Sequence, residues 1–571
     1  MKKDILKRFT PQLFISLRTY NKEKFTKDLM GGFIVGIVAL PMALAFGIAS
    51  GVSPEKGLIT AIVAGYIFSF LGGSSVQIAG PTGAFILIIY NTIQGYGTEG
   101  LIVVTIMSAI IILAMGFLRL GIVIKFIPYP IIVGYMAGIA VIIFSTQFKD
   151  FLGLTINETI PPDFIGKWAV YIRHIQTVDY PTLGIGILSL LIIIFAGKIS
   201  KKIPALLLTV IIITVLVYLL RNCCDIVSVA TIEDLYKNSE ANVEVAGRSL
   251  PLIQLINELF PAAFTLAILG SIETLVSASV ADGVTGERNN SNQELIAHGI
   301  ANLAMPIFGG IPATGAVART MTNVNSGGNT PISGIVHSTF LLFVMLFLGS
   351  LTKHIPLVCL TAILIIVAYN ISEWRSFVEL LRNSKADVAV LLTTFLLTLI
   401  FDLTVALITA LVLAIFLFLK RTNEVSKVSV VRGELDLSHD AELTHEEERF
   451  VLPKGVEVYE IDGPFFFGMA NKFEESMRVI GDKAKVRIIR MRKVPFMDST
   501  GMHNLESLCD KSKRDGIQII LSGVRSNVHA MIDKSNIPTM IGEENICAHI
   551  SLALERTLVI LSEIDNKTDK E

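Results

Sequence analysis

Gly80-Pro81-Thr82-Gly83 interrupts an apolar part of the chain just before a short hydrophobic stretch, and Ser326-Gly327-Gly328-Asn329-Thr330-Pro331 does the same in the second half. Each break combines small residues with a proline, which is typical of a helix start whose first amides have no intrahelical acceptor. Paired Gly/Pro breaks at matching positions of two halves are typical of transporters built from inverted repeats. The two breaks therefore predict a substrate site near the middle of a membrane domain.

The composition places most of the chain in a lipid bilayer. Of its 571 residues, 52% are hydrophobic and 17% are charged, and residues 57–98 contain no Asp, Glu, Lys or Arg. Twelve apolar runs reach the roughly 20 residues that a membrane-crossing helix needs. Two shorter runs, 82–94 and 371–381, bring the number of spans to fourteen. The predicted fold is an α-helical polytopic membrane protein with 14 transmembrane helices in a 7+7 inverted repeat, followed by an α/β domain.

The basic residues predict the orientation of the chain. Eight Lys or Arg lie within residues 1–30, and Lys420 and Arg421 follow the last apolar run. By the positive-inside rule both termini lie in the cytoplasm, which requires an even number of spans. The net charge of −1 and the lack of a long basic stripe argue against a nucleic-acid partner.

The domain boundaries follow from these runs. In the C-terminal part, short apolar strands alternate with helical periods, which is typical of a small α/β domain. Neither part contains a Walker loop, metal-ligand spacing or nucleophile elbow, so we expect no enzymatic activity. The predicted segments are a cytoplasmic N-terminal segment at 1–30, a first repeat at 31–222, an outer loop at 223–258, a second repeat at 259–421, a polar linker at 422–455 and a cytoplasmic domain at 456–571.

The amides of a helix start, together with the helix dipole, can hold an anion without a buried Lys or Arg. We expect the two broken helices to point at each other and to hold a small anion between them. The alternative is that both breaks are kinks whose polar groups neighbouring helices satisfy. The predicted substrate-binding residues are Met42, Phe46, Pro81, Thr82, Gly83, Ala84, Gly328, Asn329 and Thr330.

Glu273 is the only ionisable residue between Leu259 and Ala281. A carboxyl group at membrane depth is costly to ionise and marks a functional site by default. Ser277 lies one turn later on the same helix face. The pair predicts cation coupling, either by a proton on Glu273 or by Na⁺ held between Glu273 and Ser277. A protonated Glu273 bonded to neighbouring backbone is the structural alternative, and no other metal or cofactor is expected.

Arg319 lies close to the second break. We interpret it as a structural residue that reaches the interface or pairs with an acid, with added positive potential at the pocket as the alternative.

Asp498-Ser499-Thr500-Gly501 lies between a predicted strand and an amphipathic helix. Ser or Asp at this place caps the helix. A phosphate on Ser499 would meet the positive end of the helix, so Ser499 is a candidate regulatory residue.

Six segments of the chain carry a family resemblance, at 32–41, 49–54, 80–82, 269–282, 319–320 and 330–334. Together they resemble the sulfate permease (SulP) family of anion transporters, and the resemblance covers nearly the whole chain. Asp498-Ser499-Thr500-Gly501 is similar to the signature of the sulfate transporter and anti-sigma-factor antagonist (STAS) domain.

The resemblance implies a core domain that moves against a gate domain, a homodimer, and a STAS domain that can bind a cytoplasmic protein partner. Pro41-Met42 replaces the Pro-Gln of many members and resembles the bacterial branch that includes bicarbonate and C4-dicarboxylate carriers. A bacterial cytoplasmic (inner) membrane is therefore implied. Glu273 stands where bacterial bicarbonate carriers place an Asp ligand for Na⁺, and a Glu there resembles the proton-coupled members.

These observations predict H⁺-coupled symport of a small anion, such as bicarbonate, a C4-dicarboxylate or sulfate, by alternating access. Na⁺-coupled symport, anion exchange, a passive anion channel and a nucleobase-type carrier stay open. A membrane-anchored sensor that acts through its STAS domain also stays open.

Overall fold

The computed structural model describes residues 10–121, 128–156, 158, 161, 163–199, 204–224, 229–235, 251–401, 403–431, 434–436, 449–467 and 484–568. These residues form two compact units, Met1–Ala414 and Ile415–Glu571. Most of the predicted outer loop at 223–258 and most of the acidic stretch in the predicted linker lie outside the described residues.

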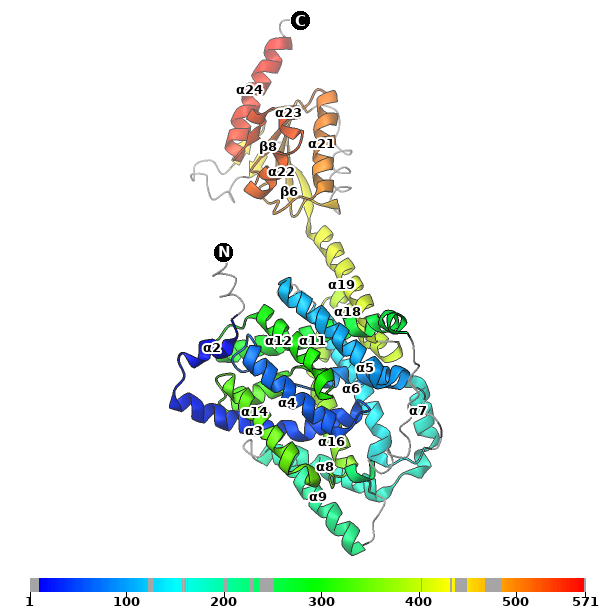
Figure 1. Ribbon diagram of the computed structural model, residues 1–571. Coiled ribbons are helices and arrows are strands. Elements are labelled where there is room, and N and C mark those ends of the chain that lie inside the picture. The colour runs from blue at the N-terminus through cyan, green and yellow to red at the C-terminus, as the bar shows by residue number, and fades with distance from the viewer. Residues whose placement is uncertain are drawn as a thin grey trace. The chain divides into compact units, whose positions relative to one another are not determined.

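The first unit is almost entirely helical (Figure 1). Among the described residues, seven helices are long and apolar enough to cross a membrane, and α8, α9 and α14 are shorter apolar helices. The elements of the first half are α2 (Gln12–Leu17), α3 (Lys22–Ala49), α4 (Pro54–Leu71), β1 (Ala79–Gly80), η1 (Gly83–Phe85), α5 (Ile86–Phe117), α6 (Tyr129–Leu152), α7 (Phe164–Arg173), η3 (Ile175–Thr177), α8 (Tyr180–Ile199) and α9 (Ala205–Cys224). The elements of the second half are α11 (Leu252–Thr285), α12 (Ser291–Phe308), β2 (Thr314–Gly315), α13 (Val317–Asn325), α14 (Ile332–Phe347), α15 (Gly349–Thr352), α16 (Leu357–Ile371), α17 (Trp374–Leu380), α18 (Lys385–Ile400) and α19 (Leu403–Val425).

The order of helix, helix, two-residue strand and helix start occurs once in each half. It reads α3, α4, β1 and η1 in the first half, and α11, α12, β2 and α13 in the second. The packing is reciprocal, because α5 packs on α11 and α12 whereas α14 packs on α3 and α4. The remaining helices repeat this exchange, with α6 against α16 and α18, and α16 against α8. The chain therefore has the predicted inverted repeat.

The short span predicted at 371–381 in the second half is wrong, and the third span of that half lies elsewhere in the structure. The run at 371–381 contains only the end of α16 and the seven-residue α17. The matching element is α13, a nine-residue helix that carries Arg319 and follows β2 as η1 follows β1. Hydropathy missed α13 because it is short and polar. With α5 broken at Gly97, where φ is 66°, each half of the described chain supplies seven spans, and the total is the predicted fourteen.

Glycines allow the first helices of the unit to pack closely. A Cβ at Gly57 of α4 would clash with the carbonyl oxygen of Ala43 in α3, and a Cβ at Gly32 would clash with the carbonyl oxygen of Ser333 in α14. Small residues at such crossings let two membrane helices approach to backbone contact. The α3–α4 and α3–α14 contacts therefore depend on glycine.

The second unit is built on a five-stranded sheet with the order β3-β6-β7-β8-β9. Strand β3 is antiparallel to β6, and the other neighbours are parallel. Helices α21, α22 and α23 contribute to the hydrophobic cluster on one face, and α24 contributes to the cluster on the other. The elements are β3 (Lys427–Val431), β4 (Glu434–Asp436), β5 (Arg449–Val451), β6 (Val456–Asp462), β7 (Val486–Arg490), α21 (Ser499–Arg514), β8 (Gln518–Ser522), α22 (Ser526–Ile532), α23 (Ile537–Ile541), η4 (Glu543–Asn545), β9 (Ile546–Cys547) and α24 (Ile550–Thr568).

The predicted α/β domain is present, but its predicted start at Val456 is too late. Strand β3 lies inside the stretch predicted as a linker and pairs with β6 along its whole length. Similarly, α11 begins at Leu252, before the predicted start of the second repeat at 259.

We expect Gly57→Ala to lower the melting temperature of the detergent-solubilised protein by several degrees. Overpacking a tight contact costs about 1–3 kcal/mol, and here the added methyl group meets a backbone oxygen that cannot rotate away. Gly95→Ala in α5 is the matched control, since its Cβ would have no atom within 4 Å. Equal melting temperatures for the two variants would contradict the close α3–α4 contact.

Candidate functional site

A cavity of about 550 Å³ lies inside the first unit. Its walls come mainly from α3, η1, α6, α11, the start of α13 and the end of α16, with single contributions from α8 and α19 and two residues of α9. Both halves of the repeat therefore contribute. The predicted site residues among its lining are Met42, Phe46, Thr82, Gly83, Ala84 and Glu273. Most of the lining is apolar, and its charged residues are Glu273, Arg319 and Glu373.

Two helix starts reach this cavity from opposite directions. Strands β1 and β2 pair antiparallel, Ala79 with Gly315 and Gly80 with Thr314. Since η1 follows β1 and α13 follows β2, the antiparallel pairing sends the two helices away from each other and leaves both starts at the pair. Their amide-bearing ends therefore converge on one point. The second of these starts is that of α13, and not the predicted break at 326–331.

The two starts are capped differently. At the first start, the Thr82 side chain accepts a hydrogen bond from the Ala84 amide. At the second, Ala316 makes no side-chain cap, and Val317, Ala318 and Arg319 all line the cavity. The first-turn amides of a helix have no intrahelical acceptor, so the start of α13 is suited to bind an anion.

Neighbouring helices hold the strand pair in place through buried polar groups. The Thr274 hydroxyl in α11 lies 2.7 Å from the Thr314 hydroxyl and accepts from the Gly315 amide at 3.1 Å. From α12, the His298 ring lies 2.9 Å from the Ala313 carbonyl. The site is thus supported by side chains whose own positions are fixed, which is how precise binding geometry is maintained.

Glu273 joins the coupling helix to the first helix start. Its Oε1 accepts a hydrogen bond from the Thr82 hydroxyl at 2.8 Å, and Thr82 is the capping residue. Its Oε2 is buried and has no hydrogen-bond partner among the described residues. A buried oxygen without a partner is costly for a carboxylate. It is the natural position for a proton or for a bound cation.

Arg319 is buried, with 3% of its surface exposed. Its guanidinium donates a hydrogen bond to the Pro81 carbonyl, and it is close enough to Glu273 for the two charges to interact. It reaches no interface, so that part of the interpretation is wrong. Arg319 combines a structural bond to the first helix start with positive charge at the cavity.

Gly328, Asn329 and Thr330 do not line the cavity, so their predicted place beside Pro81–Ala84 is wrong. These residues precede α14, and Asp28 of α3 accepts the hydrogen bonds that their donors offer. Asp28 accepts from the Asn329 amide at 2.7 Å, the Thr330 amide at 3.0 Å and the Thr330 hydroxyl at 2.6 Å. This second Gly/Pro break is therefore a helix start capped by a buried acid.

Two further predicted residues contact the site without lining the cavity. Pro81 supplies the carbonyl that Arg319 binds. Ser277 donates to the Thr320 hydroxyl at 3.1 Å and is directed at α13. The residues missed by sequence reasoning are Val317 and Ala318, and the signal that could have found them is Arg319, a rare cation inside a span.

In the second unit, Asp498 caps α21 by accepting from the Gly501 amide at 2.7 Å. Ser499 is the first residue of that helix and is exposed. The capping part of the prediction is confirmed, and Ser499 is accessible for modification.

Comparison with known proteins agrees with this arrangement. The sulfate permease family matches residues 25–394, and the STAS domain matches residues 451–553. The chain belongs to the sulfate permease family. Its members are multi-pass membrane proteins that transport anions, so the predicted class of protein is confirmed.

Individual relatives cover nearly the whole chain. The putative sulfate transporter YvdB of Bacillus subtilis is 37% identical over 536 residues, which are 93% of this chain and 97% of that protein. The bicarbonate transporter BicA of Picosynechococcus is 29% identical over 522 residues, covering 89% of this chain and 90% of that one. Among solved structures, SLC26A9 has the same fold, with a TM-score of 0.82 over 99% of this chain and 95% of that one at 17% identity.

We expect Thr82→Val to reduce anion uptake by at least tenfold, because it removes the hydroxyl that donates to Glu273 and caps the first helix start. Loss of such a cap costs about 0.5–2 kcal/mol. Thr82→Ser, which keeps the hydroxyl, should retain most of the uptake. Equal uptake by the two variants in reconstituted vesicles would show that the hydroxyl has no role.

Proposed function

We propose that this protein is a secondary active transporter that carries a small anion across the bacterial cytoplasmic membrane together with H⁺, by alternating access. The observation that carries the proposal is the bond between Glu273 and Thr82 at a helix start, in the same cavity as Arg319. The anion site and the cation-coupling group are thereby in direct contact.

The anion is held in this proposal by the amides of Gly83 and Ala84, by those of Val317 and Ala318, and by the Arg319 guanidinium. Met42 and Phe46 limit its size from α3. A cavity of about 550 Å³ with apolar walls accommodates bicarbonate, sulfate or a C4-dicarboxylate. The names of the relatives, a putative sulfate transporter and a bicarbonate transporter, support a small oxyanion.

Coupling follows from the charges. Ionised Glu273 interacts favourably with Arg319 and cancels much of the positive potential that an anion needs. Protonation of Glu273 removes this competition, so the proton and the anion favour each other's binding reciprocally. With a proton and a monovalent anion bound, the site keeps the net charge of zero that ionised Glu273 and Arg319 give it when empty. Binding the anion without the proton would add a negative charge and raise the cost of moving the site through the membrane.

Na⁺ coupling is the second candidate, and the unpartnered Glu273 Oε2 is the oxygen that would contact the ion. Its predicted second ligand, Ser277, is bonded to Thr320 instead. This observation favours H⁺.

In the proposed cycle, the core helices α3, α4, α5 and α11–α14 move against the gate helices α6, α8, α9, α16, α18 and α19. Both termini lie in the cytoplasm, and the protein acts as a homodimer. The exposed Ser499 and the STAS domain offer a place for regulation or for a cytoplasmic protein partner.

We expect Glu273→Gln to abolish uptake driven by a pH gradient while preserving anion exchange in part, since Gln cannot carry the proton but keeps the bond to Thr82. The measurement is uptake of labelled sulfate, bicarbonate, succinate, fumarate and chloride into proteoliposomes, with and without the gradient. Glu258→Gln, on an exposed residue of the same helix, is the matched control.

Unaltered pH-driven uptake by the Glu273→Gln variant would overturn H⁺ coupling. Wild-type flux that follows voltage and ignores the pH gradient would indicate a passive channel, and a dependence on Na⁺ would establish the second candidate. Competition by uracil would indicate a nucleobase carrier.

A further inference from the structure

A second cavity of about 580 Å³ lies farther along the same helices and is not part of the site described above. It is lined by the C-terminal end of α3, the start of α5, the end of α6, α7 and the start of α16. We propose that this cavity is a second anion-binding site, in which Lys149 and Lys167 hold the small anion on the outer side before it enters the central cavity. The proposal rests on the proposed function for the direction of transport.

The two cavities follow one path between the same four helices. The central cavity touches α3 at Met42 and Phe46, and the second one touches it at Ala45, Ile48 and Ala49. The same succession runs from Gly83 and Ala84 of η1 to the start of α5 at Ile86–Gln94. It also occurs on α6, from Ile131–Met136 to Thr146–Asp150. Helix α16 contributes in the reverse direction. The second cavity is thus lined by residues that follow or precede those of the central cavity on the same helices.

An apolar constriction separates the two cavities. A Cβ at Gly83 would lie within 4 Å of the Ile371, Ile143 and Phe46 side chains, which shows how closely these three surround the first helix start. Phe46 itself lines the central cavity, and its neighbour Ala45 lines the second. A small movement of α3 and α5 against α6 and α16 would connect the two spaces.

The second cavity carries two lysines without an ion-pair partner among the described residues, Lys149 in the last turn of α6 and Lys167 in α7. Burial lowers the pKa of Lys167, and the charge of Asp163 offsets part of that effect. Asp150 also lines the cavity and interacts with Lys149. Asp163 is engaged in capping α7, where it accepts from the Gly166 amide at 2.6 Å. The wall of the cavity therefore carries two lysines and one carboxylate, that of Asp150.

Neutral polar groups complete the wall, as oxyanion sites require donors beyond the charges. Tyr171 and Gln147 are buried and line the cavity, and Tyr90, Asn91 and Gln94 lie on α5. Apolar residues of α3 and α16 form the opposite wall. An anion here would be partly removed from water, where charge interactions are stronger.

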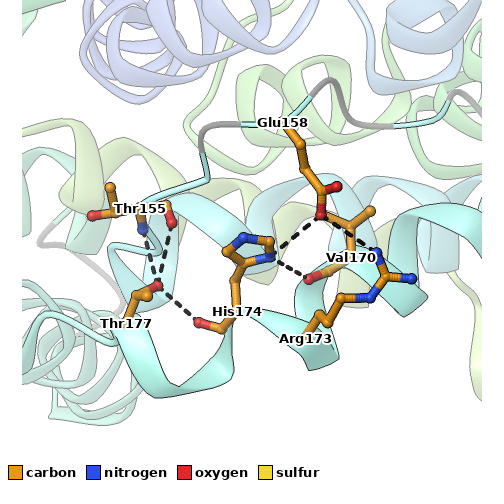
Figure 2. A network of polar contacts seen from close by, with 6 residues as sticks. All are labelled: Thr155, Glu158, Val170, Arg173, His174 and Thr177. Carbon is orange, nitrogen blue, oxygen red and sulfur yellow. Dashed lines mark hydrogen bonds and ion pairs between the residues drawn. The ribbon is translucent and has the colours of Figure 1, made fainter.

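Helix α7 is held firmly over this cavity. The Trp168 indole donates to the Ser145 hydroxyl at 3.0 Å, and the Trp168 and Tyr171 rings pack against Phe148. Figure 2 shows the end of the helix, where Thr177 bonds Thr155 and the His174 carbonyl, and Glu158 lies close to Arg173 and His174. Lys167 is therefore presented to the cavity by a fixed element.

The cavity lies on the outer side if the termini are cytoplasmic. Helix α3 begins at the N-terminal side of the bundle, so its C-terminal end, which lines the second cavity, lies at the opposite face. The lysines would raise the local anion concentration at the entrance, which increases association rates and is screened by salt.

The transport test compares Lys149→Gln/Lys167→Gln with wild type in right-side-out membrane vesicles, using labelled sulfate and bicarbonate. We expect the double variant to raise the KM for influx at least fivefold and to change efflux from preloaded vesicles by less than twofold. Arg173→Gln, on an exposed arginine of the same helix, should leave both unchanged. An unchanged influx KM, or equal losses in both directions, would overturn the proposal.

A binding test separates this site from the proposed function. The chain has two tryptophans, so in a Trp374→Phe background Trp168 alone reports on α7. Iodide should quench Trp168 emission at least twofold more strongly in the protein that keeps Lys149 and Lys167 than in the double variant. Sulfate should reduce this iodide quenching. The neutral quencher acrylamide should quench both proteins equally. Equal iodide quenching would overturn the site. Lysine-dependent quenching in a protein that transports none of the anions would refute the proposed function alone.

Discussion

The antiparallel pairing of β1 with β2 is the constraint on which the rest of the membrane unit depends. Two residues from each half meet there, and the chain continues from them into η1 in one direction and α13 in the other. A membrane interior tolerates non-helical backbone only where protein or a cavity satisfies it. Here the two strands pair their backbone groups with each other, and the buried side chains of Thr274 and His298 bond the backbone beside them. The amides of the adjoining helix starts face the cavity.

The charges of the site follow from that geometry. Arg319 lies in the first turn of α13 and bonds the Pro81 carbonyl, so the cation of one half is fixed to the helix start of the other. Glu273 bonds Thr82 from α11. Glu273, Arg319 and the two helix starts thus form one connected network. In the function proposed above, an anion and a proton bind to this network, and each alters the binding free energy of the other.

Much of this arrangement could be predicted from the sequence, because helix breaks and buried charges leave strong signals. The first break, Glu273 and the inverted repeat were identified. The second break was assigned to Gly328–Thr330, because glycine and proline are more conspicuous than Ala316-Val317-Ala318. Asp28 lies some 300 residues from Thr330 in sequence, and only folding brings the two together. The amides of this helix start therefore already bond a carboxylate of the protein itself. Polar α13 also escaped a search based on hydropathy.

The account is tested most directly by locating the anion itself. Crystals grown with selenate, an oxyanion whose selenium scatters anomalously, would place it without assumptions about coupling. The account predicts a peak within hydrogen-bonding distance of the η1 and α13 amides and beside Arg319. A peak against Asn329 and Thr330, or none in this cavity at a concentration that saturates transport, would contradict it.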